Sequence, residues 1–319
     1  MIVSASYKTD IPAFYGKWFR NRLEAGFCRM ANPYNRNQRF VVSLRQEDVD
    51  GFVFWTKNVV PFMGVLDEVH ELGFPFIVQY TINGYPRALE SRVVDAARSI
   101  ESVRDIADKF GARTNIWRYD TIIFSSLTDP EFHRENFAKI AAELAGATDE
   151  VVVSFMQLYT KTQWNMDKAA QDYGFDWVDP PAETKRELLS SLVEVAAANG
   201  MNLTICTQPD LMVSGAGESR CIDAQRLSDV SDRPIQAKIK GMRTGCGCFE
   251  SKDIGDYDTC PHGCVYCYAV RRRSLALKRY QSHDPEGEYL FPVKPLPSDV
   301  EPPEHSQDTQ LPLRLIPRA

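Results

Sequence analysis

Short apolar runs recur along the chain, separated by longer stretches in which apolar residues follow a helical period. The runs are rich in β-branched and aromatic residues, which favours β-strands. The predicted strands cover residues 1–6, 52–56, 74–82, 115–120, 151–156 and 202–207. The predicted helices cover residues 11–26, 62–73, 90–111, 135–146 and 183–200, and each ends at a glycine or just before one. In the last helix, Leu188, Leu192 and Val195 lie on one stripe.

Strands that are apolar over nearly their whole length, alternating with helices, predict a parallel sheet covered by helices. We therefore expect an α/β fold, specifically a full or partial parallel β/α (TIM-like) barrel with a cysteine-rich segment near the C-terminus. A doubly wound open sheet is the alternative, although no glycine-rich dinucleotide loop follows the first strand. The predicted organisation is a barrel over residues 1–210, a cysteine-rich segment packed on its mouth over 211–290, and a disordered, proline-rich tail over 291–319.

Polar residues gather where the predicted strands end. In a parallel barrel these ends share one face, which is the face where barrel enzymes carry their chemistry. We expect contacts to substrate or cofactor from Asp10, Lys57, Asn58, Arg118, Asp120, Gln157 and Tyr159. Two structural alternatives stay open: Asp10 can be the N-cap of the next helix, and Arg118 can form an ion pair with Asp120.

Composition narrows the class of protein. With 319 residues, 44% hydrophobic and 25% charged, the chain can bury a sizeable core. The first residues lack the pattern of a secretion signal and no run reaches the ~18 apolar residues of a membrane helix, so we expect a cytoplasmic protein. The net charge of −6 gives no overall attraction to nucleic acid, although residues 271–280 are locally basic.

The cysteines are the strongest chemical signal. Cys260, Cys264 and Cys267 have the spacing C-x3-C-x2-C, so that three of the eight cysteines fall within eight residues. In a reducing cytoplasm such clusters bind metals or do chemistry more often than they form disulfides. Thiolates suit zinc, Cu(I) and iron–sulfur clusters. Structural zinc takes four ligands, whereas the triplet offers three cysteines and, inside the loop, His262. A [4Fe–4S] cluster bound by three thiolates keeps one iron open for another ligand.

Four other cysteines are candidates for a second metal site. They are Cys206 at a strand end, Cys221, and the pair Cys246 and Cys248 between glycines. Four thiolates suffice for a second [4Fe–4S] cluster, which we favour, or for zinc. Ordinary buried packing is the alternative. Cys28, which the pattern places on an early helix, is interpreted as a packing residue.

The stretch "CPHGCVYC" resembles the signature of the radical S-adenosylmethionine enzymes, with Tyr266 at the aromatic position beside the third cysteine. The resemblance implies a [4Fe–4S] cluster whose open iron binds the amino and carboxylate groups of S-adenosylmethionine, and whose reduction cleaves it to methionine and a 5′-deoxyadenosyl radical. It also implies a full or partial β/α barrel and a cofactor contact at Tyr266. The basic stretch 269–280 is the helix expected after a cluster loop.

A longer resemblance covers residues 1–285. The segments "TDIPAFY", "FWTKN", "IWRYD", "CID", "GCGC", "DIGDYDTCPHGCVYCYA" and "HDP" are similar to the bacterial family of unknown function DUF1848, which carries its cysteine motif at the C-terminal end. This resemblance implies a cofactor class and no particular reaction.

The sequence thus predicts a radical S-adenosylmethionine enzyme acting on a small molecule or another unidentified substrate, with an electron donor such as flavodoxin or ferredoxin as partner. One alternative is a zinc-stabilised barrel hydrolase or binding protein. Another is a nucleic-acid-associated, repair-like radical enzyme, suggested by the basic residues 271–279 and the aromatic residues of "YCYA".

Overall fold

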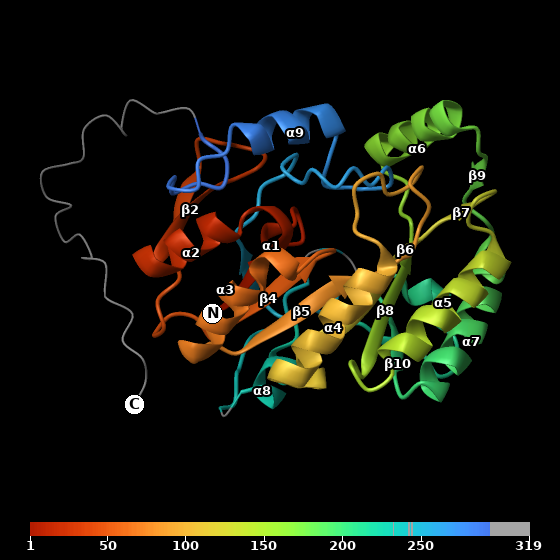
Figure 1. The fold of residues 1–319 in the computed structure, drawn as a ribbon, viewed down its shortest axis with the longest axis horizontal. Helices are drawn as coiled ribbons and strands as arrows, with labels where there is room; N and C mark the ends of the chain where they lie inside the picture. The colour runs from red at the N-terminus through yellow and green to blue at the C-terminus, as the bar shows by residue number, and fades with distance from the viewer. Residues whose placement is uncertain (232, 242, 244, 294–319) are drawn as a thin grey trace, which may run out of the picture.

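An eight-stranded parallel sheet forms the centre of the protein (Figure 1). A computed structural model describes residues 1–293 except 232, 242 and 244, so most of the predicted tail lies outside the described residues. The strand order is β11-β10-β8-β6-β5-β4-β1-β12. The strands are β1 (Ile2–Ala5), β4 (Gly51–Thr56), β5 (Phe76–Thr81), β6 (Asn115–Ile122), β8 (Glu150–Phe155), β10 (Asn202–Ile205), β11 (Gly217–Glu218) and β12 (Ser251–Asp253).

The strand order identifies the type of winding. From β1 to β11 the neighbours in the sheet follow each other in sequence, whereas a doubly wound sheet reverses direction at a switch point. The predicted α/β fold of barrel type is therefore confirmed, and the doubly wound alternative is wrong. Within the described residues β11 and β12 do not pair with each other.

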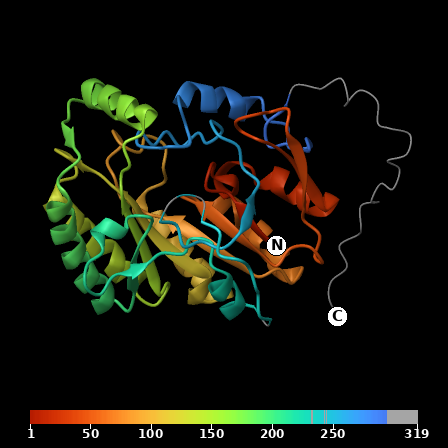
Figure 2. The same ribbon diagram turned by 180° about the vertical axis from the view of Figure 1, so that it is seen from behind.

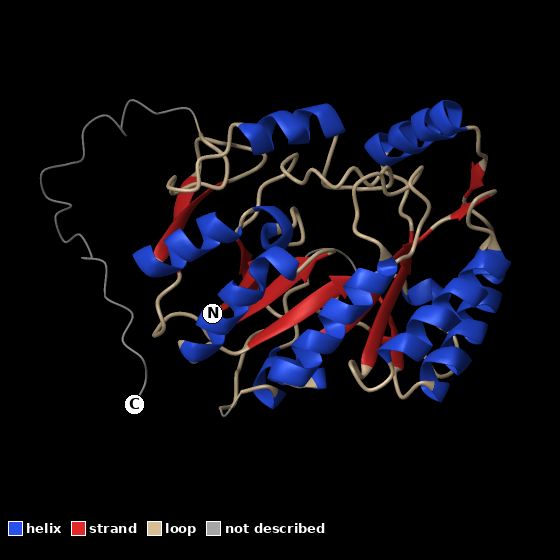
Figure 3. Cartoon of the chain, in the orientation of Figure 1, coloured by secondary structure: helices blue, strands red, loops and turns tan. Residues whose placement is uncertain are grey.

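Helices connect the strands (Figure 3). They are α1 (Ile11–Phe14), α2 (Gly16–Ala25), α3 (Met63–Glu71), α4 (Ala96–Phe110), α5 (Pro130–Leu144), α6 (Thr160–Tyr173), α7 (Ala182–Ala198), α8 (Ala224–Asp229) and α9 (Arg273–Gln281), with 3-10 turns η1 (Val60–Phe62), η2 (Ala112–Thr114) and η3 (Pro209–Leu211). Two small antiparallel pairs join β2 (Phe27–Ala31) with β3 (Arg39–Ser43), and β7 (Phe124–Ser125) with β9 (Trp177–Val178). In the part of the chain that is described, no helix has the length and apolar character to cross a membrane.

The first predicted helix is divided in two, and the prediction for Cys28 is wrong in its element. Gly26, with a φ of 77°, ends α2 in the left-handed conformation that glycine adopts at low cost. The chain then enters the β2–β3 hairpin, which places Cys28 on a strand. Its side chain is fully buried, and burial raises the pKa of the thiol to about 12. The interpretation of Cys28 as a packing residue agrees with this environment.

The two faces of the sheet have different coverings. One face, with Val3, Phe54 and Val153, forms the main core together with the connecting helices. The opposite face, with Val53 and Ile116, packs against the segment that contains α8 and residues 219–249. Figure 2 shows this segment, coloured teal to light blue, crossing the sheet. The cysteine-rich segment thus fills the inner face of the sheet and also supplies two of its strands.

Candidate functional site

The loop with the cysteine triplet is held against the segment that follows β5. Val265 N donates to Leu89 O at 3.1 Å, and Arg92 N donates to His262 O at 3.1 Å. An isolated antiparallel bridge joins Glu90 to Cys264. These backbone contacts fix the cysteine loop to the carboxyl end of the sheet. In Figure 1 the blue segment that carries the loop runs above the strand ends, below α9.

Asp10 connects the same loop to two strand ends. Its carboxylate accepts from Ala13 N at 2.9 Å as the N-cap of α1, and from Lys57 N at 2.7 Å. His262 Nε2 lies 2.7 Å from Oδ2 of Asp10. Asp10 is therefore an N-cap, as the structural alternative held, and in addition it joins the ends of β1 and β4 to the cysteine loop.

Lys57 and Tyr266 meet at a buried carboxylate. Lys57 Nζ lies 2.8 Å from Glu90 Oε1, and the hydroxyl of Tyr266 donates to the same oxygen. Asn83 Nδ2 donates to the Tyr266 hydroxyl at 3.0 Å. Glu90 is 3% exposed, so its charge is compensated almost wholly by protein groups. Burial and the neighbouring Glu90 raise the pKa of Tyr266, so this hydroxyl stays protonated.

The three thiols of the triplet share one electrostatic environment. Burial is the main cause that raises the pKa of Cys260, Cys264 and Cys267. Glu90 and the other two thiols raise the pKa of Cys264 further, whereas Lys57 lowers it. A metal centre bound by these thiols would lower their pKa values, because a thiol that coordinates a metal is deprotonated.

The donor set of the triplet fits an iron–sulfur cluster. Among the described residues, no three His, Cys, Asp or Glu side chains are placed so that they could hold a single metal ion. A cuboidal cluster takes one thiolate per iron, so three cysteines leave one iron without a protein ligand. Three thiols on one clamped loop, each partly exposed, supply the ligand chemistry that such a cluster takes.

A second polar group lies on the inner face of the sheet, around Arg118. This side chain is 4% exposed, and its guanidinium donates to Asp120 Oδ2 at 3.1 Å, to Gln79 Oε1 at 3.1 Å and to Cys221 Sγ at 3.0 Å. Although burial acts to raise it, the pKa of Asp120 is lowered, because Arg118 and Ser154 stabilise the carboxylate. The ion pair between Arg118 and Asp120 is formed, as the structural alternative held.

Gln157 and Tyr159 lie at the end of β8 on this side. Both Arg243 Nη1 and the Tyr159 hydroxyl donate to Gln157 Oε1, at 2.8 and 2.9 Å. Arg243 Nη2 is also 3.9 Å from Cys206 Sγ. Asn58 belongs to neither group, because its side chain accepts from Val60 N at 3.3 Å in the turn before α3.

The strand-end residues therefore fall into two groups. Asp10 and Lys57 lie against the cysteine triplet. Arg118, Asp120 and Gln157 lie towards the four remaining candidate cysteines. Cys206 Sγ is 3.7 Å from Cys221 Sγ. The hydrogen bond with Cys221, together with burial, raises the pKa of Cys206.

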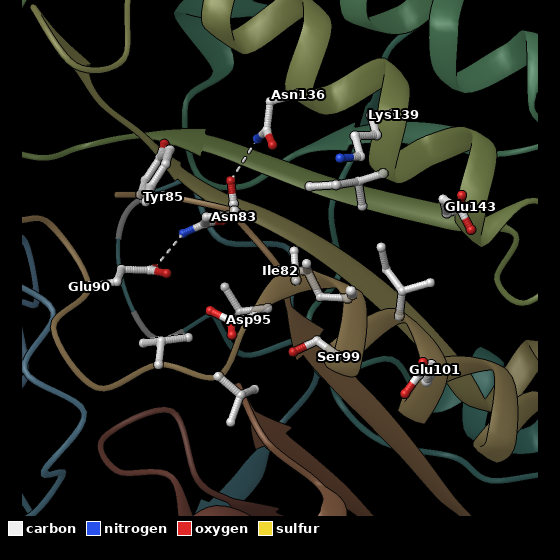
Figure 4. Close-up of a pocket in the computed structure, with 18 of the residues that line it drawn as sticks. Ile82, Asn83, Tyr85, Glu90, Asp95, Ser99, Glu101, Asn136, Lys139 and Glu143 are labelled. Carbon is white, nitrogen blue, oxygen red and sulfur yellow. Dashed lines mark hydrogen bonds between the residues drawn. The ribbon is translucent and has the colours of Figure 1, made fainter. Parts of the chain in front are cut away.

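A cavity of about 380 Å³ lies between helices α4 and α5 and the loop after β5, which is the loop that contacts the cysteine triplet (Figure 4). Asn83, Glu90, Ser99, Asn136 and Lys139 are among its lining residues. Figure 4 shows Glu90 turned towards Asn83, with Asn136 bonded to the Asn83 backbone. Glu90 thus connects this cavity to Lys57 and Tyr266.

Sequence reasoning missed Glu90 and Arg243. Glu90 falls in a stretch whose pattern predicted a helix, whereas α4 begins at Ala96. The polar stretch 79–83, which ends at Asn83, lies at the end of a predicted strand. It was the one sequence signal that pointed to the surroundings of Glu90.

Fold and site together define a singly wound α/β protein whose strand ends and inner face carry two groups of cysteines. The model of the family described as "Domain of unknown function (DUF1848)" matches residues 2–269, and the chain belongs to this family. No curated protein matches the chain. Among solved structures, a D-hydantoinase from Bacillus sp. AR9 matches at 10% identity and a TM-score of 0.29, covering 67% of this chain. The match spans 39% of the hydantoinase chain, and a likeness this low supports no inference about activity.

Proposed function

We propose that the protein is a radical S-adenosylmethionine-type enzyme with a [4Fe–4S] cluster on Cys260, Cys264 and Cys267. The observation that carries this proposal is the clamped C-x3-C-x2-C loop at the carboxyl end of a singly wound parallel sheet. That edge is where barrel enzymes bring together residues from several strands.

The chain's own residues give the loop its position and its electrostatics. Asp10 holds the loop through His262, and Glu90 holds it through Tyr266. Burial raises the pKa of Cys264, and the ammonium group of Lys57 partly offsets that increase. When bound, the cluster and S-adenosylmethionine supply the 5′-deoxyadenosyl radical.

The proposed chemistry requires an electron donor from outside the chain, and helix α9 together with the two residues before it offers a surface for such a donor. Arg271, Arg272, Arg273 and Lys278 are exposed, and no ion pair within the described residues involves them. Arg273 packs close to Gly263 in the cysteine loop. A chain with a net charge of −6 that concentrates unpaired cations beside its cysteines favours an acidic electron-transfer protein such as flavodoxin or ferredoxin. The cationic surface is also the feature that would favour the nucleic-acid alternative.

Anaerobic reconstitution with iron and sulfide tests the proposal. We expect C264A to bind about four irons per chain fewer than the wild type and to form no 5′-deoxyadenosine from S-adenosylmethionine. C28A removes a buried cysteine far from the triplet in sequence and controls for loss of a thiol. Equal iron content and equal 5′-deoxyadenosine in C264A and C28A overturn the proposal. A wild type that takes up zinc and no iron supports the zinc-stabilised alternative.

A further inference from the structure

We propose that Cys206, Cys221, Cys246 and Cys248 form a second thiolate metal site, separate from the triplet and buried on the inner face of the sheet. Its role is to fix the segment 219–249 in place. This inference does not depend on radical chemistry at the triplet.

The four cysteines come from two parts of the chain that the fold brings together. Cys206 follows β10, and the other three lie in the segment over the inner face. Cys206, Cys221 and Cys248 belong to one buried cluster, and Cys246 packs against it. Apolar packing alone does not require thiols at these four positions, because valine or alanine could make the same contacts. The gathering of four cysteines therefore indicates a function for their sulfur atoms.

The separation of the first two sulfurs fits a shared ion. The Sγ atoms of Cys206 and Cys221 are 3.7 Å apart. Two thiolates at about 2.3 Å from one tetrahedral metal stand about 3.8 Å from each other. The Cys221 thiol also interacts with that of Cys248.

Hydrogen-bond donors surround these sulfurs. The guanidinium of Arg118 donates to Cys221 Sγ at 3.0 Å, and Ile222 N donates to Cys248 Sγ at 3.4 Å. Arg243 approaches Cys206 at 3.9 Å. Donors of this kind stabilise anionic sulfur and orient metal ligands. A neutral buried thiol has little need of a guanidinium, whereas a centre with several thiolates does.

Backbone contacts hold the segment that carries the two remaining cysteines. Lys240 N donates to Cys248 O at 2.9 Å, and Phe249 N donates to Ile222 O at 3.0 Å. At Gly241 a Cβ atom would lie 2.1 Å from the carbonyl oxygen of Cys246, so only glycine permits this approach. Because no three described ligand side chains are already placed around one ion, binding requires a local rearrangement, chiefly at Cys246, which packs against the buried cluster.

Zinc and an iron–sulfur cluster share this ligand chemistry, and one experiment distinguishes them. The full-length C260A/C264A/C267A variant, which lacks the triplet, is loaded with zinc, or with iron and sulfide. We expect stable binding of one of the two, measured as metal per chain, with visible absorption only for the cluster. Adding C206S/C221S should reduce the bound metal at least about tenfold, whereas adding C28S should leave it unchanged.

A second measurement needs no substitution. Wild-type protein with and without metal is alkylated while folded, and the modified cysteines are identified by mass spectrometry. We expect metal to protect Cys206, Cys221, Cys246 and Cys248. The proposal is overturned if the triplet-free variant binds neither zinc nor iron, if C206S/C221S leaves binding unchanged, or if metal protects none of the four. Loss of cofactor cleavage with the second site intact would instead contradict the proposed function.

Discussion

His262 Nε2 and Asp10 Oδ2 lie 2.7 Å apart although 252 positions separate the two residues in the chain. One belongs to the cysteine loop and the other caps the first helix. The contact explains how a motif near the C-terminal end reaches the edge formed by the first strands. It is reinforced by β12, which pairs with β1 just before the loop begins.

Removing the Asp10 carboxylate should destabilise the protein more than loss of a helix cap alone. In D10A the cap of α1 and the partner of His262 are both lost, and we expect the free energy of unfolding to fall by about 2–4 kcal/mol. Urea denaturation followed by circular dichroism measures this. D10N keeps a capping side chain and should lose less than half as much; a D10A loss no larger than that of D10N would refute the double role.

Lys57 should be needed mainly as the partner of Glu90. In K57M the carboxylate stays buried without its cation, and we expect a loss of about 3 kcal/mol in unfolding free energy. The double variant K57M/E90Q removes the uncompensated charge and should recover at least half of that loss in the same denaturation experiment. Additive losses in the double variant would show that the two side chains do not act as a pair.

Much of the sheet could be predicted because its strands are buried on both faces. Val53 and Phe54, for example, are adjacent and both fully buried, which makes the run apolar without interruption. Helix α6 was not predicted, because its buried stripe consists of Thr162, Met166 and Ala169, and only one of these is a large apolar residue. The β2–β3 hairpin was missed; in β3 Phe40 and Val41 are exposed and only Val42 is buried, so the strand lacks the alternating burial of a half-buried strand.

The site was predictable where its chemistry is local. The triplet spacing alone pointed to Cys260, Cys264 and Cys267. Glu90 could not be found in this way, because its hydrogen bond to Tyr266 spans 176 positions of sequence. The strand-end residues divide into two groups because their side chains lie on different faces of the sheet. The pattern of polar residues in the sequence does not show which face each side chain lies on.

His133 should make the protein sensitive to mild acid. It is fully buried between the Tyr119 hydroxyl and Ile123 O, and burial lowers its pKa from 6.5 to about 4. The unfolded chain therefore binds a proton that the folded protein resists, so this contribution to stability is present above pH 6.5 and is lost progressively down to about pH 4. The full loss is about 3 kcal/mol. In H133Q the free energy of unfolding should fall less between pH 7 and about pH 4.5; parallel pH profiles would contradict this role.

The cations at the start of α9, including Arg271 and Arg272 just before it, should govern the rate of electron delivery to the cysteine loop. Reversing Arg271 and Arg272 to glutamate should slow reduction by an acidic flavodoxin at least about tenfold at low salt, because the charges steer the encounter. The difference should shrink as salt is added. Reduction by dithionite, a small reagent that needs no docking surface, should be unchanged in the variant. K109E reverses another exposed cation, on α4, and should leave both rates near those of the wild type. Equal slowing by K109E would show that net charge alone causes the effect. If the protein binds single-stranded DNA more tightly than flavodoxin, and added salt weakens that binding, the surface would instead be assigned to nucleic acid.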